Sequence, residues 1–264
     1  MNRLSIDQIK EKAPMAFATE AAPTTSAKYS FLPSSRIMED MEKLGWYVGE
    51  AKSMKAGGKN PLRATHGKHI LQFFNPDVVI KNEGGVEAYP QIVVTNDSAG
   101  WGKIKIDAGL FRLVCENGLV IKSQDMGSLH LRHMGYTFED LQTLVNQFVE
   151  GLQAVTTKLN TFQQKIMTIE EQRAFAAKAL QIRMGEEKIA TSEEINQMLQ
   201  VRREADQGDN LWVVFNRVQE AIIRGGNSYI DAKGKLRTAR PIKNMIQDMK
   251  INQGIWEVAE EYVA

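Results

Sequence analysis

The 264-residue sequence contains a single cysteine, Cys115, and its formal net charge at pH 7 is only +1. One cysteine excludes an intrachain disulfide and a cysteine-rich zinc site, and it fits a reducing compartment. A net charge near zero gives no global field that would announce a nucleic-acid or membrane partner. The sequence has no apolar run of the ~18 residues that a membrane span needs, and no apolar signal-peptide stretch near Met1. We therefore expect a cytoplasmic protein.

The composition is that of an ordinary globular protein. Apolar residues make up 43% and charged residues 25% of the chain. A core of real size is therefore available. The length allows one large domain or two small ones. Residues 1–30 combine a short amphipathic piece with the sequence APTTSAKYS, and we interpret them as a mobile arm that docks on a neighbour.

Residues 31–138 predict an antiparallel sheet with one short helix. The helix is capped by Ser34 or Ser35 and ends at Gly45. Runs rich in β-branched and aromatic residues predict strands. The strands do not alternate with helices, so an antiparallel sheet is favoured over a parallel one. The turn-forming residues Asn96–Gly100 predict a hairpin, and Asn117-Gly118 predicts a second turn. The predicted strands cover 46–48, 69–74, 89–95, 103–106, 111–115, 119–121 and 128–134.

Residues 139–264 predict a helical region packed on the sheet. Apolar residues step by alternating intervals of four and three residues, a heptad stripe that indicates one long helix. This stripe either sets an oligomer or braces the sheet. Thr168–Glu171 and Thr191–Glu194 predict capping boxes of further helices, and Gly225-Gly226 ends another. The stripe consists of Leu141, Val145, Phe148, Leu152, Val155, Leu159, Phe162, Ile166 and Ile169. The fold class we predict is α+β: a twisted antiparallel sheet, then a long helix and a helical C-terminal part.

Four histidines form the pairs His66/His69 and His130/His133, which suggest zinc. Both pairs fall in predicted strand regions, and on a strand positions i and i+3 face opposite sides of the sheet, so a shared metal ion is disfavoured. Cys115 is followed by a carboxylate, Glu116, which raises a thiol pKa rather than lowering it. We expect no metal, no cofactor and no catalytic residue, and we interpret Cys115 as a small buried residue beside a turn.

Charge is concentrated in two segments predicted to be loops. No acidic residue occurs between Ala51 and Asn75, where seven Lys, Arg and His residues lie, and a second basic run occupies 233–243. The first segment lacks the pattern of a nucleotide-hydrolysing phosphate loop. Two basic loops beside aromatic side chains favour binding of a phosphate backbone with stacked bases, although charge runs are usually only solvated. The predicted phosphate-binding residues are Lys55, Lys59, Arg63, Lys68, Arg112, Lys235, Arg237 and Arg240, and the stacking residues are Trp101 and Phe73.

Four short motifs resemble a known family. They are Asn96-Asp-Ser-x-Gly100, Phe111-Arg-Leu-Val-Cys-Glu-Asn-Gly118, Leu211-Trp-Val-Val-Phe-Asn-Arg217 and Ile251-Asn-Gln-Gly-Ile-Trp256. Together they resemble the phage/plasmid-like proteins, domain of unknown function 932, over roughly residues 30–264. The resemblance implies a protein of phages, prophages or conjugative plasmids in the bacterial cytoplasm, and it supplies no catalytic residues. The family often has a histidine within the first motif, and this sequence does not.

The predicted sheet, long helix and basic loops look like the plan of phage single-strand annealing proteins, which is an analogy of fold. The leading hypothesis is non-specific binding of single-stranded DNA by a homo-oligomer, a ring or filament, in recombination or replication. A second hypothesis is an anti-defence or regulatory protein that binds a host protein, and a third is a metal-dependent nuclease that uses the histidine pairs.

Overall fold

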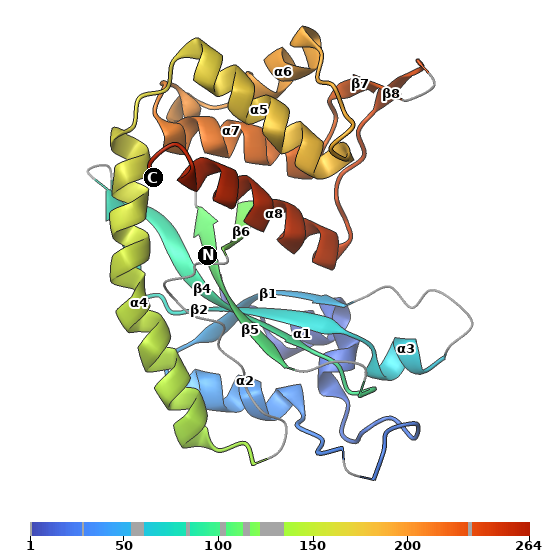
Figure 1. The fold of residues 1–264 in the computed structure, drawn as a ribbon. Helices are drawn as coiled ribbons and strands as arrows, with labels where there is room; N and C mark the ends of the chain where they lie inside the picture. Colours follow the sequence, from blue (N-terminus) through green and yellow to red (C-terminus); the bar gives the residue numbers. More distant parts are fainter. Residues whose placement is uncertain are drawn as a thin grey trace. The chain divides into compact units, whose positions relative to one another are not determined.

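The computed structural model divides into two compact units, Met1–Gln153 and Ala154–Ala264. The first contains an antiparallel sheet and the second is mainly helical, which confirms the predicted α+β class (Figure 1). The boundary falls within the long helix α4 (Phe138–Gln164) rather than at its start. The structure describes residues 2–27, 29–53, 61–82, 85–100, 104–112, 117–121, 135–231 and 234–264.

The described strands of the first unit form one antiparallel sheet in the order β1-β2-β4-β5-β6, and β3 also pairs with β4. Consecutive strands β4 and β5 are neighbours, with Thr95 opposite Lys105, so the predicted hairpin around Asn96–Gly100 is present. The strands are β1 (Tyr47–Ser53), β2 (His69–Phe74), β3 (Ile80–Asn82), β4 (Gly85–Asn96), β5 (Lys105–Arg112) and β6 (Asn117–Ile121).

Two predictions about β5 and β6 were wrong. Two separate strands were expected around Gly109, but β5 is continuous, with Gly109 opposite Gln91 of β4 and Val120 of β6. Backbone hydrogen bonds on both sides of a strand do not depend on a side chain, so glycine is held there. The turn expected at Asn117-Gly118 is instead the start of β6, where Asn117 pairs with Arg112. Cys115 and the strand predicted over 128–134 lie outside the described residues.

The N-terminal residues pack on the sheet unit in place of the expected mobile arm. Helix α1 (Ile6–Lys12) has a capping box at Ser5, and a 3-10 helix (Pro14–Phe17) follows. The Leu4 amide donates to the carbonyl of Val48 at 2.8 Å, which ties this segment to β1. Five apolar side chains of this N-terminal segment are buried, namely Ile9, Ala13, Met15, Ala16 and Ala22.

Helix α2 (Ser34–Lys43) buries Ile37 and Met41 completely, and Gly45 follows it with φ +79°. The predicted serine cap was wrong. Pro33 occupies the N-cap position, and the Ser34 hydroxyl contacts the imidazole of His69 instead. The short helix α3 (Leu62–His66) precedes β2.

The heptad stripe of α4 (Phe138–Gln164) is buried within the chain. In the first unit the Phe148 ring meets Trp46 edge-on, with ring centroids 5.4 Å apart. In the second unit Phe162 lies 5.0 Å from Trp256. Ile166 and Ile169 are 65% and 70% exposed, because the helix ends before them. The stripe therefore supplies core residues to the chain itself.

The described part of the second unit contains four further α-helices, a short 3-10 helix and a hairpin. The capping boxes predicted at Thr168 and Thr191 are confirmed at the starts of α5 and α6, and Gly225 ends α7 as predicted. Figure 1 shows the hairpin projecting from the helices of this unit. The elements are α5 (Ile169–Met184), α6 (Ser192–Leu199), a 3-10 helix (Glu204–Asp206), α7 (Leu211–Arg224), β7 (Ser228–Ile230), β8 (Leu236–Thr238) and α8 (Met245–Glu260).

Helix α7 lies at the centre of this unit, and all its residues from Leu211 to Ile222 are buried. Phe215 stacks on Trp212 at 5.7 Å and meets Trp256 edge-on at 5.8 Å. Buried polar side chains normally have hydrogen-bond partners. In α7, for example, the Gln219 side-chain amide donates to the side-chain oxygen of Asn252 at 2.8 Å. None of the described helices has an apolar stretch long enough to cross a bilayer.

Candidate nucleic-acid interface

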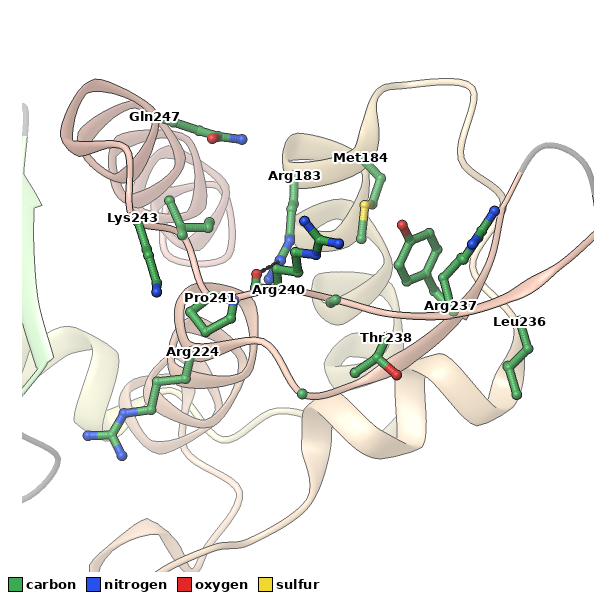
Figure 2. A pocket seen from close by; sticks show the side chains of 14 residues that line it. Arg183, Met184, Arg224, Leu236, Arg237, Thr238, Arg240, Pro241, Lys243 and Gln247 are labelled. Atoms are coloured by element: carbon green, nitrogen blue, oxygen red, sulfur yellow. Dashed lines mark hydrogen bonds between the residues drawn. The ribbon is translucent and has the colours of Figure 1, made fainter. Parts of the chain in front are cut away.

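A basic pocket of about 1050 Å³ lies in the second unit, beside the hairpin (Figure 2). Its walls come from the ends of α5 and α7, from the hairpin, and from the segment that leads into α8. Five of its lining side chains are cationic, and none of the described lining residues is acidic. We call these five residues the pocket cations: Arg183, Arg224, Arg237, Arg240 and Lys243.

The pocket wall formed by 239–242 is held against the end of α7 by backbone hydrogen bonds. The Gly226 amide donates to the Ala239 carbonyl at 2.8 Å, and the Ile242 amide donates to the Ile223 carbonyl at 2.9 Å. Gly225 permits this approach. A Cβ atom at Gly225 would lie 2.5 Å from the Ala239 oxygen and 2.8 Å from the Arg240 carbonyl carbon. The close contact between these two backbone segments fixes the position from which the Arg240 side chain projects.

Arg183, in the last turn of α5, joins two walls of the pocket. Its guanidinium donates one hydrogen bond to the carbonyl of Ile222 and another to the carbonyl of Arg240. Burial lowers its pKa, because partial removal from water disfavours the charged form. Among the described residues no carboxylate lies within 4 Å of this half-buried cation, so its charge is balanced only by carbonyl dipoles.

The other pocket cations fall into two groups. Arg224 pairs with Glu220 at 3.1 Å, and Arg237 pairs with Asp231 at 2.9 Å. Arg240 and Lys243 are exposed, and within the described parts of the chain neither has a carboxylate partner within 4 Å. Arg183, Arg240 and Lys243 are therefore three cations in one hollow that no carboxylate among the described residues neutralises.

This arrangement suits an anion with several acceptor oxygens. Arginine presents a rigid fork of N–H donors that matches phosphate geometry. The pocket also has apolar surface from Met184, Leu236 and Pro241, and an aromatic ring from Tyr229. A ligand that combines phosphate with flat apolar groups fits both kinds of wall.

The structure brings together only part of the predicted interface. Arg237 and Arg240 line the pocket, and Lys235 is exposed next to the same hairpin. Lys68 is half-buried just before β2 in the first unit. Lys55, Lys59 and Trp101 lie outside the described residues. Arg63 lies in α3 and Arg112 ends β5, and their side chains are not among those described.

The prediction that Phe73 stacks on bases was wrong. Phe73 is 0% exposed in β2, a strand that is paired on both sides, with β1 and with β4. Its side of the strand faces the core, so no base can reach the ring. The two basic segments belong to different compact units, and binding of one phosphate backbone by both of them stays a prediction.

The histidine pair in the first unit is not a shared site. His69 is 1% exposed, with its Nε2 2.8 Å from the Ser34 hydroxyl and its Nδ1 3.2 Å from the Gly67 carbonyl. Burial lowers its pKa to about 4, so the ring is neutral at pH 7. His66 is half-exposed and contacts Thr65. Among the described residues no group of three or more His, Cys, Asp and Glu side chains could hold a metal ion. His130 and His133 lie outside them.

Sequence reasoning missed Arg183 and Arg224. Both lie near the ends of helices and outside the basic run at 233–243, Arg183 by about fifty residues and Arg224 by nine. Cations are common in the last turn of a helix because they interact favourably with its carbonyl end. Their position alone therefore carries no functional signal. Only the fold shows that two helix ends and a loop meet around one hollow.

Comparison with known proteins places the chain in a family. It belongs to the domain of unknown function family DUF932, which matches residues 23–256. Two relatives from Escherichia coli (strain K12) are UPF0380 protein YfjQ and UPF0380 protein YafZ. Each is 27% identical to the chain over 266 aligned positions, which cover 97% of this chain and 90% of the relative. No solved structure matches the chain significantly.

Proposed function

We propose that this protein binds single-stranded DNA through the basic pocket of its second unit and assists recombination or replication of phage or plasmid DNA, without a chemical step of its own. The observation that carries the proposal is the group of three pocket cations, Arg183, Arg240 and Lys243, that have no carboxylate partner among the described residues. Phosphate contacts by Lys and Arg supply most of the affinity in sequence-independent binding.

Two further features support the proposal. The pocket volume is about 1050 Å³. This is at the upper end of the range for small-molecule sites, so the pocket holds more than one isolated phosphate. The ring of Tyr229 lies in the lining and supplies a surface on which a base can stack. The resemblance to phage/plasmid-like proteins provides the biological setting.

The proposed assembly is a homo-oligomer, as in single-strand annealing proteins. The heptad stripe of α4 is not available for it, because Phe148 and Phe162 are already in the cores of this chain. An oligomer would have to use another surface. Light scattering of the purified protein, with and without DNA, measures the mass and tests this part of the proposal separately.

The binding test is fluorescence anisotropy with a labelled oligo-dT of about 40 nucleotides, titrated over a range of salt concentrations. On a single strand each neutralised phosphate contributes roughly −0.7 to the slope of log K against log salt, so three unpaired cations predict a slope near −2. Arg240→Ala and Lys243→Ala should each weaken binding and make the slope shallower by about 0.7.

Lys250→Ala is the matched control. Lys250 is exposed on α8 and does not line the pocket, and its removal changes the net charge by the same amount. It should leave both the affinity and the slope nearly unchanged. Absence of binding even at low salt would refute the proposal. The alternative, a regulatory protein that binds a host protein, would then be tested by co-purification with host proteins.

A further inference from the structure

The charge of Arg183 is unusual for a half-buried group. Buried or partly buried charges are normally paired with an opposite charge, because removing an ion from water is costly. Arg183 has two carbonyl oxygens as partners and no carboxylate within 4 Å among the described residues. A guanidinium has five N–H donors, so those two bonds leave others for a ligand. The pocket thus has a half-buried positive charge that a bound anion would neutralise.

Arg240 and Lys243 add two more cations to the same hollow, and neither pairs with a carboxylate of the described residues. They are separated in the chain by Pro241 and Ile242, and Figure 2 shows Arg183, Arg240 and Lys243 around the hollow with Gln247 of α8. The backbone of Arg240 is held in two ways: its carbonyl accepts a hydrogen bond from the Arg183 guanidinium, and Gly225 lies close against it. A ligand therefore meets cations that the fold has already placed.

We propose that this pocket holds the phosphorylated end of a DNA strand, a terminal phosphomonoester. The proposal rests on the proposed function and names which part of the strand enters the pocket. A phosphomonoester carries a charge of about −1.5 to −2 at pH 7 and three strong acceptor oxygens. An internal phosphodiester carries one charge and only two free oxygens. Three unpaired cations match the monoester better in both charge and number of donors.

The test compares three unlabelled oligo-dT competitors of about 12 nucleotides, a length within the site size of single-strand binding folds. One has a 5′-phosphate, one a 3′-phosphate, and one has hydroxyls at both ends. Each displaces the same internally labelled oligo-dT in an anisotropy assay at constant salt. We expect at least one phosphorylated competitor to bind about tenfold more tightly than the hydroxyl form, because charge-assisted hydrogen bonds are the strong ones.

Variants locate the effect in the pocket. Arg240→Ala should remove most of the preference for the phosphorylated end, and Lys250→Ala should retain it. Circular dichroism shows that each variant is folded before its binding is compared. A preference that persists unchanged in folded Arg240→Ala protein overturns the inference, because the phosphate is then recognised elsewhere.

A change of pH adds an independent readout. The second pKa of a phosphomonoester is about 6, so the preference should fade between pH 7.5 and 5 as the dianion gains a proton. Among the described lining residues there is no histidine and no carboxylate. The carboxylates that pair with pocket cations are Glu220, bound to Arg224, and Asp231, bound to Arg237. A preference that is equally strong at pH 5 contradicts a dianion site.

The remaining outcomes separate this inference from the proposed function. Equal affinity for the three competitors, with all three weakened by Arg240→Ala, overturns the inference and leaves strand binding intact. Failure of all three competitors and of the longer oligo-dT to bind refutes both.

Discussion

Gly225 provides the sharpest structural test, because its neighbour Gly226 is a built-in control. Both have positive φ, +68° and +87°. A Cβ atom on Gly225 would lie 2.5 Å from the Ala239 oxygen, whereas a Cβ atom on Gly226 would meet nothing within 4 Å. Both alanine variants therefore place a Cβ on a backbone with positive φ, and Gly225→Ala adds a clash with backbone atoms, which cannot move aside as a flexible side chain does.

The magnitudes follow from these contacts. Gly226→Ala should lower the free energy of unfolding by about 1 kcal/mol, the cost of a left-handed conformation for a residue with a Cβ. Gly225 has φ +68° and ψ −150°. This region is almost restricted to glycine, and strain there costs about 1–3 kcal/mol. Overpacking adds another ~1–3 kcal/mol. We expect about 4 kcal/mol in total for Gly225→Ala.

Thermal unfolding followed by circular dichroism measures the difference. For a chain of this size about 1 kcal/mol corresponds to roughly 2–4 °C in Tm, so we expect a decrease of about 3 °C for Gly226→Ala and about 10 °C or more for Gly225→Ala. Gly225→Ala should also weaken oligo-dT binding where it is still folded, because the wall that carries Arg240 must shift. Equal decreases in Tm for the two variants would refute the close contact between α7 and the 239–240 backbone.

Three further predictions concern the cores and caps. Phe148→Ala should lower the free energy of unfolding by about 3–5 kcal/mol, because it empties the contact with Trp46. Val149 is the control, because it is 40% exposed, and Val149→Ala should cost less than about 0.5 kcal/mol. Urea unfolding measures both variants. The folded pKa of His69 is about 4, below the unfolded value of about 6.5. Its contribution to the free energy of unfolding is therefore fully present above pH 6.5 and is lost as pH falls to 4, by up to about 3 kcal/mol. His69→Gln should remove that part of the pH dependence of urea unfolding. Thr168→Ala removes the α5 cap and should cost about 1 kcal/mol, and a Tm equal to wild type would contradict the capping box.

Local signals in the sequence predicted the helical half well. The threonines at 168 and 191 each precede a glutamate at the capping distance, and Gly225 follows the last apolar residue of its helix, so three helix ends were correctly predicted. These signals involve residues a few positions apart. Burial in the sheet unit depends instead on distant segments. Asn96–Ser98 were predicted as an ordinary turn. In the structure Ser98 is buried, its amide donates to the carbonyl of His66, and its carbonyl accepts from the amide of Ala22.

The candidate site was only half visible in the sequence for the same reason. The run at 233–243 identified Arg237 and Arg240 by charge density alone. Arg183 and Arg224 join them because α5 and α7 both end at the pocket, and these two helices pack together through Phe175 and Phe215. Phe73 was misassigned because the local pattern did not show that side chains on both faces of β2 are covered: Leu71 and Phe73 on one face and Ile70 and Phe74 on the other are all buried.

The all-round burial of α7 has a consequence for any shortened form of the protein. A helix without a solvent face must be enclosed by its neighbours before it is compatible with water. Removal of α8 would uncover Phe215 and leave Gln219 without its partner Asn252. Such a fragment would present a contiguous apolar surface and self-associate. Expression of the second unit therefore calls for boundaries that retain α8 in full, and a soluble, monomeric fragment ending at Arg224 would be unexpected.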